Sequence, residues 1–170
     1  TLPVGGLRLI DATGNKIEKA QPPIDEAIAQ VPWLGQGAGR PFFAVGGSWR
    51  AIARLHMEQT NYPLHVAHGY SIPTIEAVAF CEFLRKTKKL SGLAGFEELA
   101  RARREVLPFG AFVLERLLKT LNPSEVIFSV FGIREGLIYS LLPAHGRRKD
   151  PLLSFCAVYA GLRSRSVEHG

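Results

Sequence analysis

The chain has 170 residues, of which 46% are hydrophobic and 21% are charged, and its formal net charge is +6. This composition excludes a largely disordered protein, because the apolar side chains suffice to build a core that offsets chain entropy. A membrane-spanning helix is excluded as well, since the longest segment without Asp, Glu, Lys or Arg, Gln59 to Ile75, contains two prolines and two histidines.

The first half of the chain predicts strands that alternate with helices. Residues Leu2 to Ile10 alternate apolar and polar side chains, which is typical of a half-buried strand. A short helix is expected over residues 24–31. The apolar run Phe42–Val45 predicts a buried strand, and Ser48 is expected to cap a helix that continues to about residue 59. Another helix should begin at Thr74.

The second half is mostly helical. Helices are expected over residues 96–104 and 110–121, and the second is apolar nearly all round, so it should be central. Residues 126–130 predict a second buried strand, which is followed by helices over 133–142 and from Pro151 onward. This order favours an α/β fold in which helices flank a small sheet.

Both ends of the sequence look cut, because Thr1 stands where a Met would begin a complete chain and no terminal signal closes the other end. We therefore expect a fragment of a longer protein, with further strands of the same sheet lying upstream. The sheet should then present an open edge near residues 2–10.

The turn Gly46–Gly47–Ser48 is the first candidate site. A buried strand that ends in two glycines lets a ligand approach the backbone, and the following helix offers free N–H groups and a positive dipole end. These features suit a phosphate or nucleotide. The alternative is a plain strand-to-helix turn with a serine cap.

The second strand ends in a similar way. Ser129 closes it, and Gly132, Arg134, Glu135 and Gly136 follow at the start of the next helix. These residues follow the carboxyl end of the strand, and ligands of α/β proteins bind at the carboxyl ends of the strands. An Arg134–Glu135 ion pair that only holds the turn explains the same residues equally well.

Basic residues are concentrated between residues 85 and 119, where nine Lys or Arg stand against four Asp or Glu. Such a face attracts polyanions, although a solvated helix surface would have the same composition. Aromatic residues do not alternate with the basic ones, which disfavours stacking on nucleic-acid bases. His65 and His68 lack further ligands at suitable spacing, so no metal site is predicted. With only two cysteines, Cys81 and Cys156, we expect a cytoplasmic protein without a disulfide framework.

Five colinear segments resemble motifs of the exopolyphosphatase / guanosine pentaphosphate phosphatase family. In that family the glycine turn carries Thr where this chain has Ser48, and the motif that corresponds to Ser129–Leu137 carries Asp where this chain has Val130. The segments are Leu2–Leu9, Phe43–Ala53, Tyr62 with His68–Tyr70, Arg103–Ala111 and Ser129–Leu137.

The resemblance implies an actin-like, ribonuclease-H-like fold of two lobes. Residues 1–145 would form the second lobe, incomplete at its N-terminal strands, and residues 146–170 would lead into a C-terminal helical module. The first lobe, the catalytic glutamate and the main phosphate loops would lie upstream, so no catalytic residue is expected in this chain.

The resemblance also implies site residues and partners. Gly46, Gly47, Ser48 and Arg103 would contact phosphate. The residues that would brace the turn below the inter-lobe cleft are Ser129, Gly132, Arg134, Glu135 and Gly136. The full-length protein would be a homodimeric, Mg²⁺-dependent hydrolase of inorganic polyphosphate without membrane attachment. Guanosine pentaphosphate is the alternative substrate, and a basic nucleic-acid-binding module is the alternative from another class.

Overall fold

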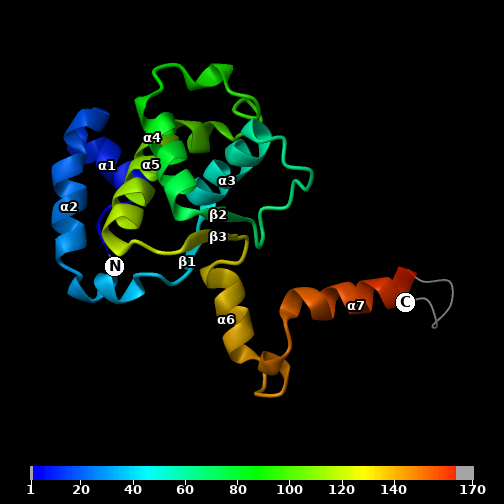
Figure 1. Cartoon of the computed structure of the whole chain (residues 1–170). Helices are drawn as coiled ribbons and strands as arrows, with labels where there is room; N and C mark the ends of the chain where they lie inside the picture. Colours follow the sequence, from blue (N-terminus) through cyan, green and yellow to red (C-terminus); the bar gives the residue numbers. More distant parts are fainter. Residues whose placement is uncertain (1, 164–170) are drawn as a thin grey trace. The chain divides into compact units, whose positions relative to one another are not determined.

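The first part of the chain contains a three-stranded mixed sheet with helices on one side of it (Figure 1). The computed structural model describes residues 2–163 and divides them into two units, which meet between Val130 and Phe131. Strand β3 (Glu125–Ser129) is central, with β1 (Phe42–Val45) parallel on one side and β2 (Ser71–Pro73) antiparallel on the other. The strands predicted over residues 42–45 and 126–130 are therefore confirmed.

One face of this sheet packs against helices. Ala44, Val126 and Phe128 alternate with exposed or half-buried neighbours and are fully buried. Helices α3 (Gly47–Gln59) and α4 (Thr74–Lys86) contact this face. Buried and exposed side chains thus alternate along the strands, because helices cover only one face of the sheet. Phe43, on the other face, is exposed.

Helix α5 (Arg101–Leu121) packs against both α3 and α4, as Figure 1 shows. Nearly every residue from Val106 to Leu118 is buried, which confirms the predicted central helix. Two separate helices were expected over residues 96–104 and 110–121, but one continuous helix runs from Arg101 to Leu121. The helix predicted over residues 96–104 is wrong at its start, since residues 96–99 form turns.

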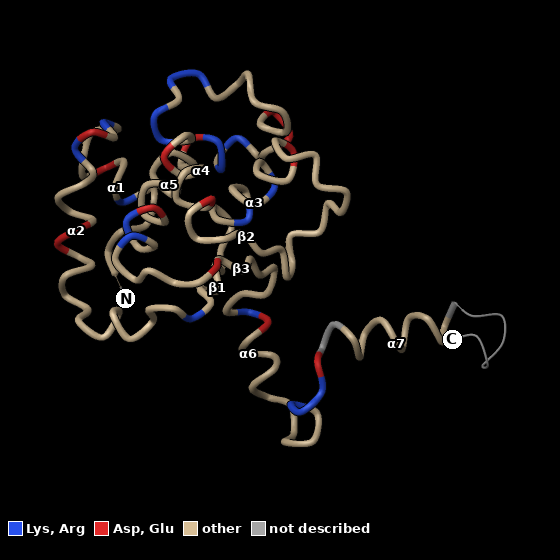
Figure 2. Tube along the Cα trace, viewed as in Figure 1, with Lys and Arg blue, Asp and Glu red and all other residues tan. Residues whose placement is uncertain are grey.

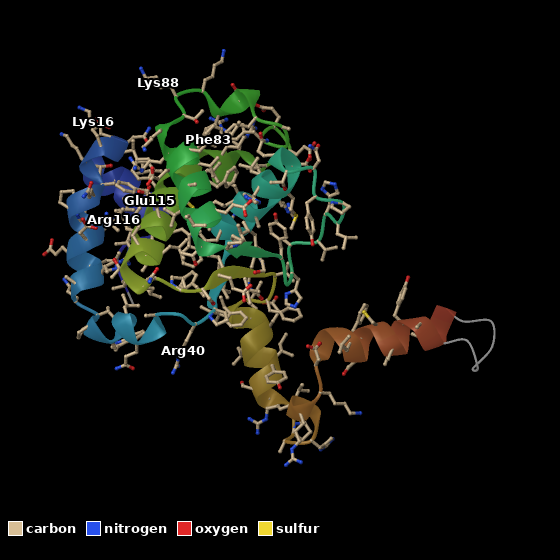
Figure 3. The ribbon with its side chains drawn as sticks, viewed as in Figure 1. Lys16, Arg40, Phe83, Lys88, Glu115 and Arg116 are labelled. Carbon is tan, nitrogen blue, oxygen red and sulfur yellow. The ribbon has the colours of Figure 1, made fainter. Side chains whose placement is uncertain are left out.

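A second helical layer covers the other side of α5. It consists of α1 (Gly6–Thr13) and α2 (Gln21–Ala29), joined by the 3₁₀ turn η1 (Ile17–Lys19) and followed by η2 (Pro32–Gly37). Arg116 of α5 points toward α2, where its Nε donates to Asp25 Oδ1 at 2.7 Å (Figure 3). This layer has its own apolar core around Ile24 and Phe112.

The strand predicted over Leu2–Ile10 is therefore wrong, and so is the open sheet edge expected there. Helical spacing places Leu9 and Thr13 together in the core next to α5, whereas Leu7 is 71% exposed. Over so few residues the apolar positions fit the period of a strand as well as that of a helix. Packing against α5 favours the helix. The sheet edges among residues 2–130 are β1 and β2.

The second unit begins with α6 (Ile133–Leu141) and continues through η4 (Gly146–Arg148) to α7 (Pro151–Arg163). Both helices were predicted. A further 3₁₀ turn, η3 (Leu90–Gly92), lies in the first unit between α4 and α5. Within residues 2–163 no helix has the length and apolarity that crossing a bilayer requires.

Candidate functional site

The glycine turn joins β1 to α3 as predicted. Gly46 has a φ of 138°, a conformation that side chains with a Cβ rarely adopt, and it lets the chain reverse into the helix at once. The expected cap is wrong: α3 begins at Gly47, and no side chain caps it. Ser48 instead lies inside the first turn, so the leading amides of α3 are left to a ligand or to water.

Arg103 comes from α5 and lies directly over this turn. A β-carbon at Gly47 would overlap the guanidinium of Arg103, which means that the lack of a side chain makes room for the arginine. Two site residues predicted from distant segments are thus in contact. Guanidinium and helix N-terminus are both positive, so they favour the same kind of ligand, an anion.

These residues line a pocket of about 380 Å³ that contains three arginines. We call it the three-arginine pocket, and its lining includes no carboxylate. Arg50 and Arg54 stand one helical turn apart on α3, and neither was among the site residues predicted from the sequence. Their spacing after the glycine turn was a signal, but arginines on helix surfaces are common. The lining residues are Gly47, Arg50, Ala51, Arg54, Leu99, Ala100, Arg103 and Val130.

The pocket differs in its pairing from most of the basic surface of α4 and α5. Most basic side chains of α4 and α5 are paired with acidic ones, and blue and red segments adjoin there (Figure 2). Across residues 2–163, no carboxylate lies within ion-pair distance of the three pocket arginines. The paired residues are Arg85 with Glu115, Lys86 with Glu82, Arg101 with Glu105, Arg104 with Glu97, Arg116 with Asp25, and Lys119 with Glu82 and Glu115.

The end of β3 forms one wall of the pocket. Arg50 Nη1 donates to the Val130 carbonyl at 2.5 Å, and the Val130 amide donates to His68 Nδ1 at 3.4 Å. Gly69 and Tyr70 continue this pairing with Phe128 through the backbone. His68 therefore braces the strand end through this hydrogen bond.

Behind this wall lies a buried hydrogen-bonded cluster. Tyr70 Oη and His56 Nδ1 are 2.7 Å apart, and His56 Nε2 lies 3.2 Å from Glu76 Oε1. Burial lowers the pKa of His56, an effect that Glu76 partly offsets. Burial also raises the pKa of Tyr70. The neutral imidazole thus accepts from the phenol and donates to the carboxylate.

A smaller hollow of about 180 Å³ lies beside the same turn. Its lining includes Gly5 and Gly6 at the start of α1, and Gly46 and Gly47 at the start of α3. Two helix N-termini therefore face one space. This adds backbone N–H donors to the positive charge of the neighbouring arginines.

The other predicted residues divide between the two units. Ser129 ends β3 in register with Val45, so the two strand ends adjoin. Gly132, Arg134, Glu135 and Gly136 belong to the second unit. There the Gly132 amide donates to Glu135 Oε2 at 2.6 Å, and Glu135 thus caps α6.

Taken together, the site can bind and neutralise an anion. No group of three or more His, Cys, Asp or Glu within residues 2–163 is arranged to hold a metal ion. A guanidinium-lined pocket would itself repel a cation. The chemistry that this part of the chain supports is therefore recognition of phosphate-like groups.

Comparison with known proteins points to one family. The profile of the Ppx/GppA phosphatase family matches residues 14–145. Retrograde regulation protein 2 of Saccharomyces cerevisiae is 29% identical over 123 residues, which are 69% of this chain and 21% of that protein.

Two crystal structures have a similar fold. An exopolyphosphatase-like protein superposes with a TM-score of 0.62 at 19% identity, over 85% of this chain and 48% of the other. The Aquifex aeolicus member of the Ppx/GppA family gives a TM-score of 0.56 at 20% identity, over 82% and 46%. The predicted actin-like α/β lobe with a small mixed sheet is confirmed. The chain spans just under half of each of these structures and about a fifth of the yeast protein.

Proposed function

Since the chain belongs to the Ppx/GppA phosphatase family, we propose that it is the phosphate-binding part of an enzyme that removes terminal phosphate from inorganic polyphosphate. The three-arginine pocket carries the proposal, because unpaired guanidinium groups next to free helix amides match the oxygens of a phosphate chain. Hydrolysis of guanosine pentaphosphate is the alternative within the same chemistry.

In this proposal the residues of the chain bind and orient the substrate. Arg103 and the amides at Gly47 and Ser48 would hold a phosphate group, and their fixed positive charge would stabilise the charge that develops during transfer. The described residues offer no carboxylate in the pocket to activate water. That group would come from the remainder of the full-length protein, so the chain alone should be inactive.

The wider organisation follows the same proposal. Residues 1–145 would be the second lobe of the phosphatase domain, and residues 146–170 would lead to a helical module. The full-length protein would form a homodimer in the cytoplasm, where the exposed thiol of Cys156 would remain reduced. Phosphatases of this family typically use a divalent metal, and Mg²⁺ assists phosphoryl transfer by neutralising charge. Residues 2–163 do not fit a site for it, so its ligands would lie elsewhere.

The test uses the full-length protein and measures phosphate release from long-chain polyphosphate and from guanosine pentaphosphate. Replacing Arg103 by Met should raise KM by about tenfold or more, because one charge-assisted contact is lost. Arg101→Met is the matched control, since Arg101 lies two residues away, is 88% exposed and pairs with Glu105. The control should leave KM unchanged. No release from either substrate would disprove the enzymatic proposal.

Binding to nucleic acid is the competing function, and the net charge of +6 favours it. It predicts that single-stranded DNA binds as tightly as polyphosphate, and that affinity falls steeply with salt. We expect polyphosphate to bind more tightly at every salt concentration, because the unpaired arginines are gathered in one pocket. Equal affinity for both ligands would favour the nucleic-acid reading.

A further inference from the structure

The three-arginine pocket continues into a second pocket of about 330 Å³, because Arg54 and Leu99 line both. Along α3 the lining residues Gly47, Arg50, Arg54 and Glu58 recur every three or four positions, so they lie on one helix face. Residues 95–103 form the opposite wall. We call this continuous hollow the α3 groove; it extends about 16 Å from residue 47 to residue 58.

The charge of the α3 groove changes sign along its length. Arg50 and Arg103 line the first half, Arg54 stands in the middle, and Glu58 and Glu98 line the second half. Glu58 Oε1 lies 3.1 Å from Nδ1 of His65, which is 65% exposed. Glu98 has no ion-pair partner among the residues that the structure describes. His65 also lines this far half, but the two carboxylates make it unfavourable for negative charge, although its volume of about 330 Å³ approaches the 380 Å³ of the first.

We propose that Glu58 and Glu98 determine how a polyanion lies in the site. This inference rests on the proposed function, because it assumes that phosphate groups occupy the three-arginine pocket. A phosphate beyond Arg54 would lie between two carboxylates, and like charges at such short range repel strongly. The end of a polyphosphate molecule therefore occupies the arginine half, and the rest of that molecule leaves the groove before Glu58. The two glutamates are specificity determinants and take no part in the chemical step.

The proposal predicts a chain-length effect. A short anion that fits within the arginine half should bind with the same affinity whether or not the glutamates are present. A long polyphosphate cannot bind in the part of the groove beyond Arg54. Neutralising both glutamates with Glu58→Gln and Glu98→Gln should open that half to phosphate. In the full-length protein, affinity for long-chain polyphosphate should then rise about tenfold, while affinity for tripolyphosphate changes less than twofold.

The matched control is the double variant Glu97→Gln and Glu105→Gln, which changes the net charge equally. Glu97 pairs with Arg104 and Glu105 with Arg101, and neither lines the groove. Calorimetric titration of all three proteins with both ligands gives the comparison. If the control tightens polyphosphate binding as much as the groove variant does, net charge explains the effect and the inference is overturned. An equal gain for tripolyphosphate overturns it too.

The arginine variants test the proposed function itself. If Arg50→Met with Arg103→Met leaves tripolyphosphate binding intact, then the arginine half is not the phosphate site, and the role of the glutamates falls with it. If those changes abolish tripolyphosphate binding while Glu58→Gln with Glu98→Gln leaves the chain-length dependence unchanged, the phosphate site stands and the inference alone fails.

Discussion

Gly46 and Gly47 are adjacent, yet they are glycines for different reasons. At Gly46 the backbone itself requires glycine, since φ is 138° while the space around the position is open. At Gly47 the backbone is helical, and the space is filled by Arg103. Substitution by alanine at each position therefore separates backbone strain from ligand binding.

Gly46→Ala should lower the free energy of unfolding by about 1–3 kcal/mol, the cost of a side chain in a rare backbone conformation. Gly47→Ala should leave stability nearly unchanged, because the tip of a flexible arginine can move aside, but it should weaken polyphosphate binding by displacing Arg103. Urea unfolding and calorimetric titration measure the two effects. If Gly47→Ala binds polyphosphate with unchanged affinity, then Arg103 does not contact polyphosphate from its position over Gly47.

At this scale the sequence predicted the turn but only part of the pocket. A strand, two glycines and a helix identify Gly46, Gly47 and Ser48 from local pattern alone. Arg103 is more than fifty positions away, and only the family resemblance connected it with the turn. Arg50 and Arg54 were missed, because what sets them apart is their place beside Arg103 in a pocket whose lining has no carboxylate. Pairing between elements depends on tertiary contacts, and only the i, i+4 pairs within one helix have a signature in the sequence.

Among the elements, α4 and α5 are joined by a buried carboxylate. Glu115 of α5 is 2% exposed; Arg85 Nε of α4 donates to it at 2.7 Å and Lys119 Nζ at 2.8 Å. Glu115 lies within the body of the molecule, whereas Lys88 stands at its outer edge (Figure 3). The Arg85 guanidinium also lies 4.5 Å from the centre of the Phe112 ring. Removing the carboxylate would leave this partly buried cation without its partner.

Glu115→Gln should therefore destabilise the protein by about 3 kcal/mol. The buried thiol of Cys81 lies in the same region, and burial raises its pKa above the usual range, with Glu115 adding to the effect. Thiol labelling of Cys81 should accelerate in the variant, with the exposed Cys156 as the internal reference. Glu82→Gln is the control: Lys119 and Lys86 hold the pKa of this surface carboxylate at about 2, yet its loss should cost much less. Equal losses in both variants would contradict a special role for Glu115.

Helices and strands were predicted correctly where the pattern of apolar residues fitted only one kind of secondary structure. The runs at 42–45 and 126–130 are too short for helices and end near glycines, and both are strands. Leu2–Ile10 was ambiguous, and contact with α5 favours the helix. The strand β2 was missed because it has three residues and ends in Pro73. It forms only because β3 offers a free edge at that point.

For the molecule as a whole, folding stability should depend on pH through His56. This residue of α3 contacts Tyr70 before β2 and Glu76 of α4, and its ring packs edge-on against Phe80. Its pKa in the folded state is lowered by burial, so the folded protein binds fewer protons than the unfolded chain below the ordinary value of 6.5. The free energy of unfolding should therefore fall as pH drops below 6.5, and it should reach a plateau above that value.

Urea unfolding measured in steps between about pH 5.5 and pH 8 tests this dependence, because few carboxylates titrate in that range. The chain should gain stability up to about pH 7 and then level off. His56→Gln keeps a polar group near Tyr70 and Glu76 but removes the titration, so the slope should flatten even if overall stability is lower. His65→Gln removes a histidine that is 65% exposed and should leave the slope as it is. A slope that persists in His56→Gln would assign the pH dependence to other groups and show that the buried cluster does not couple protonation to folding.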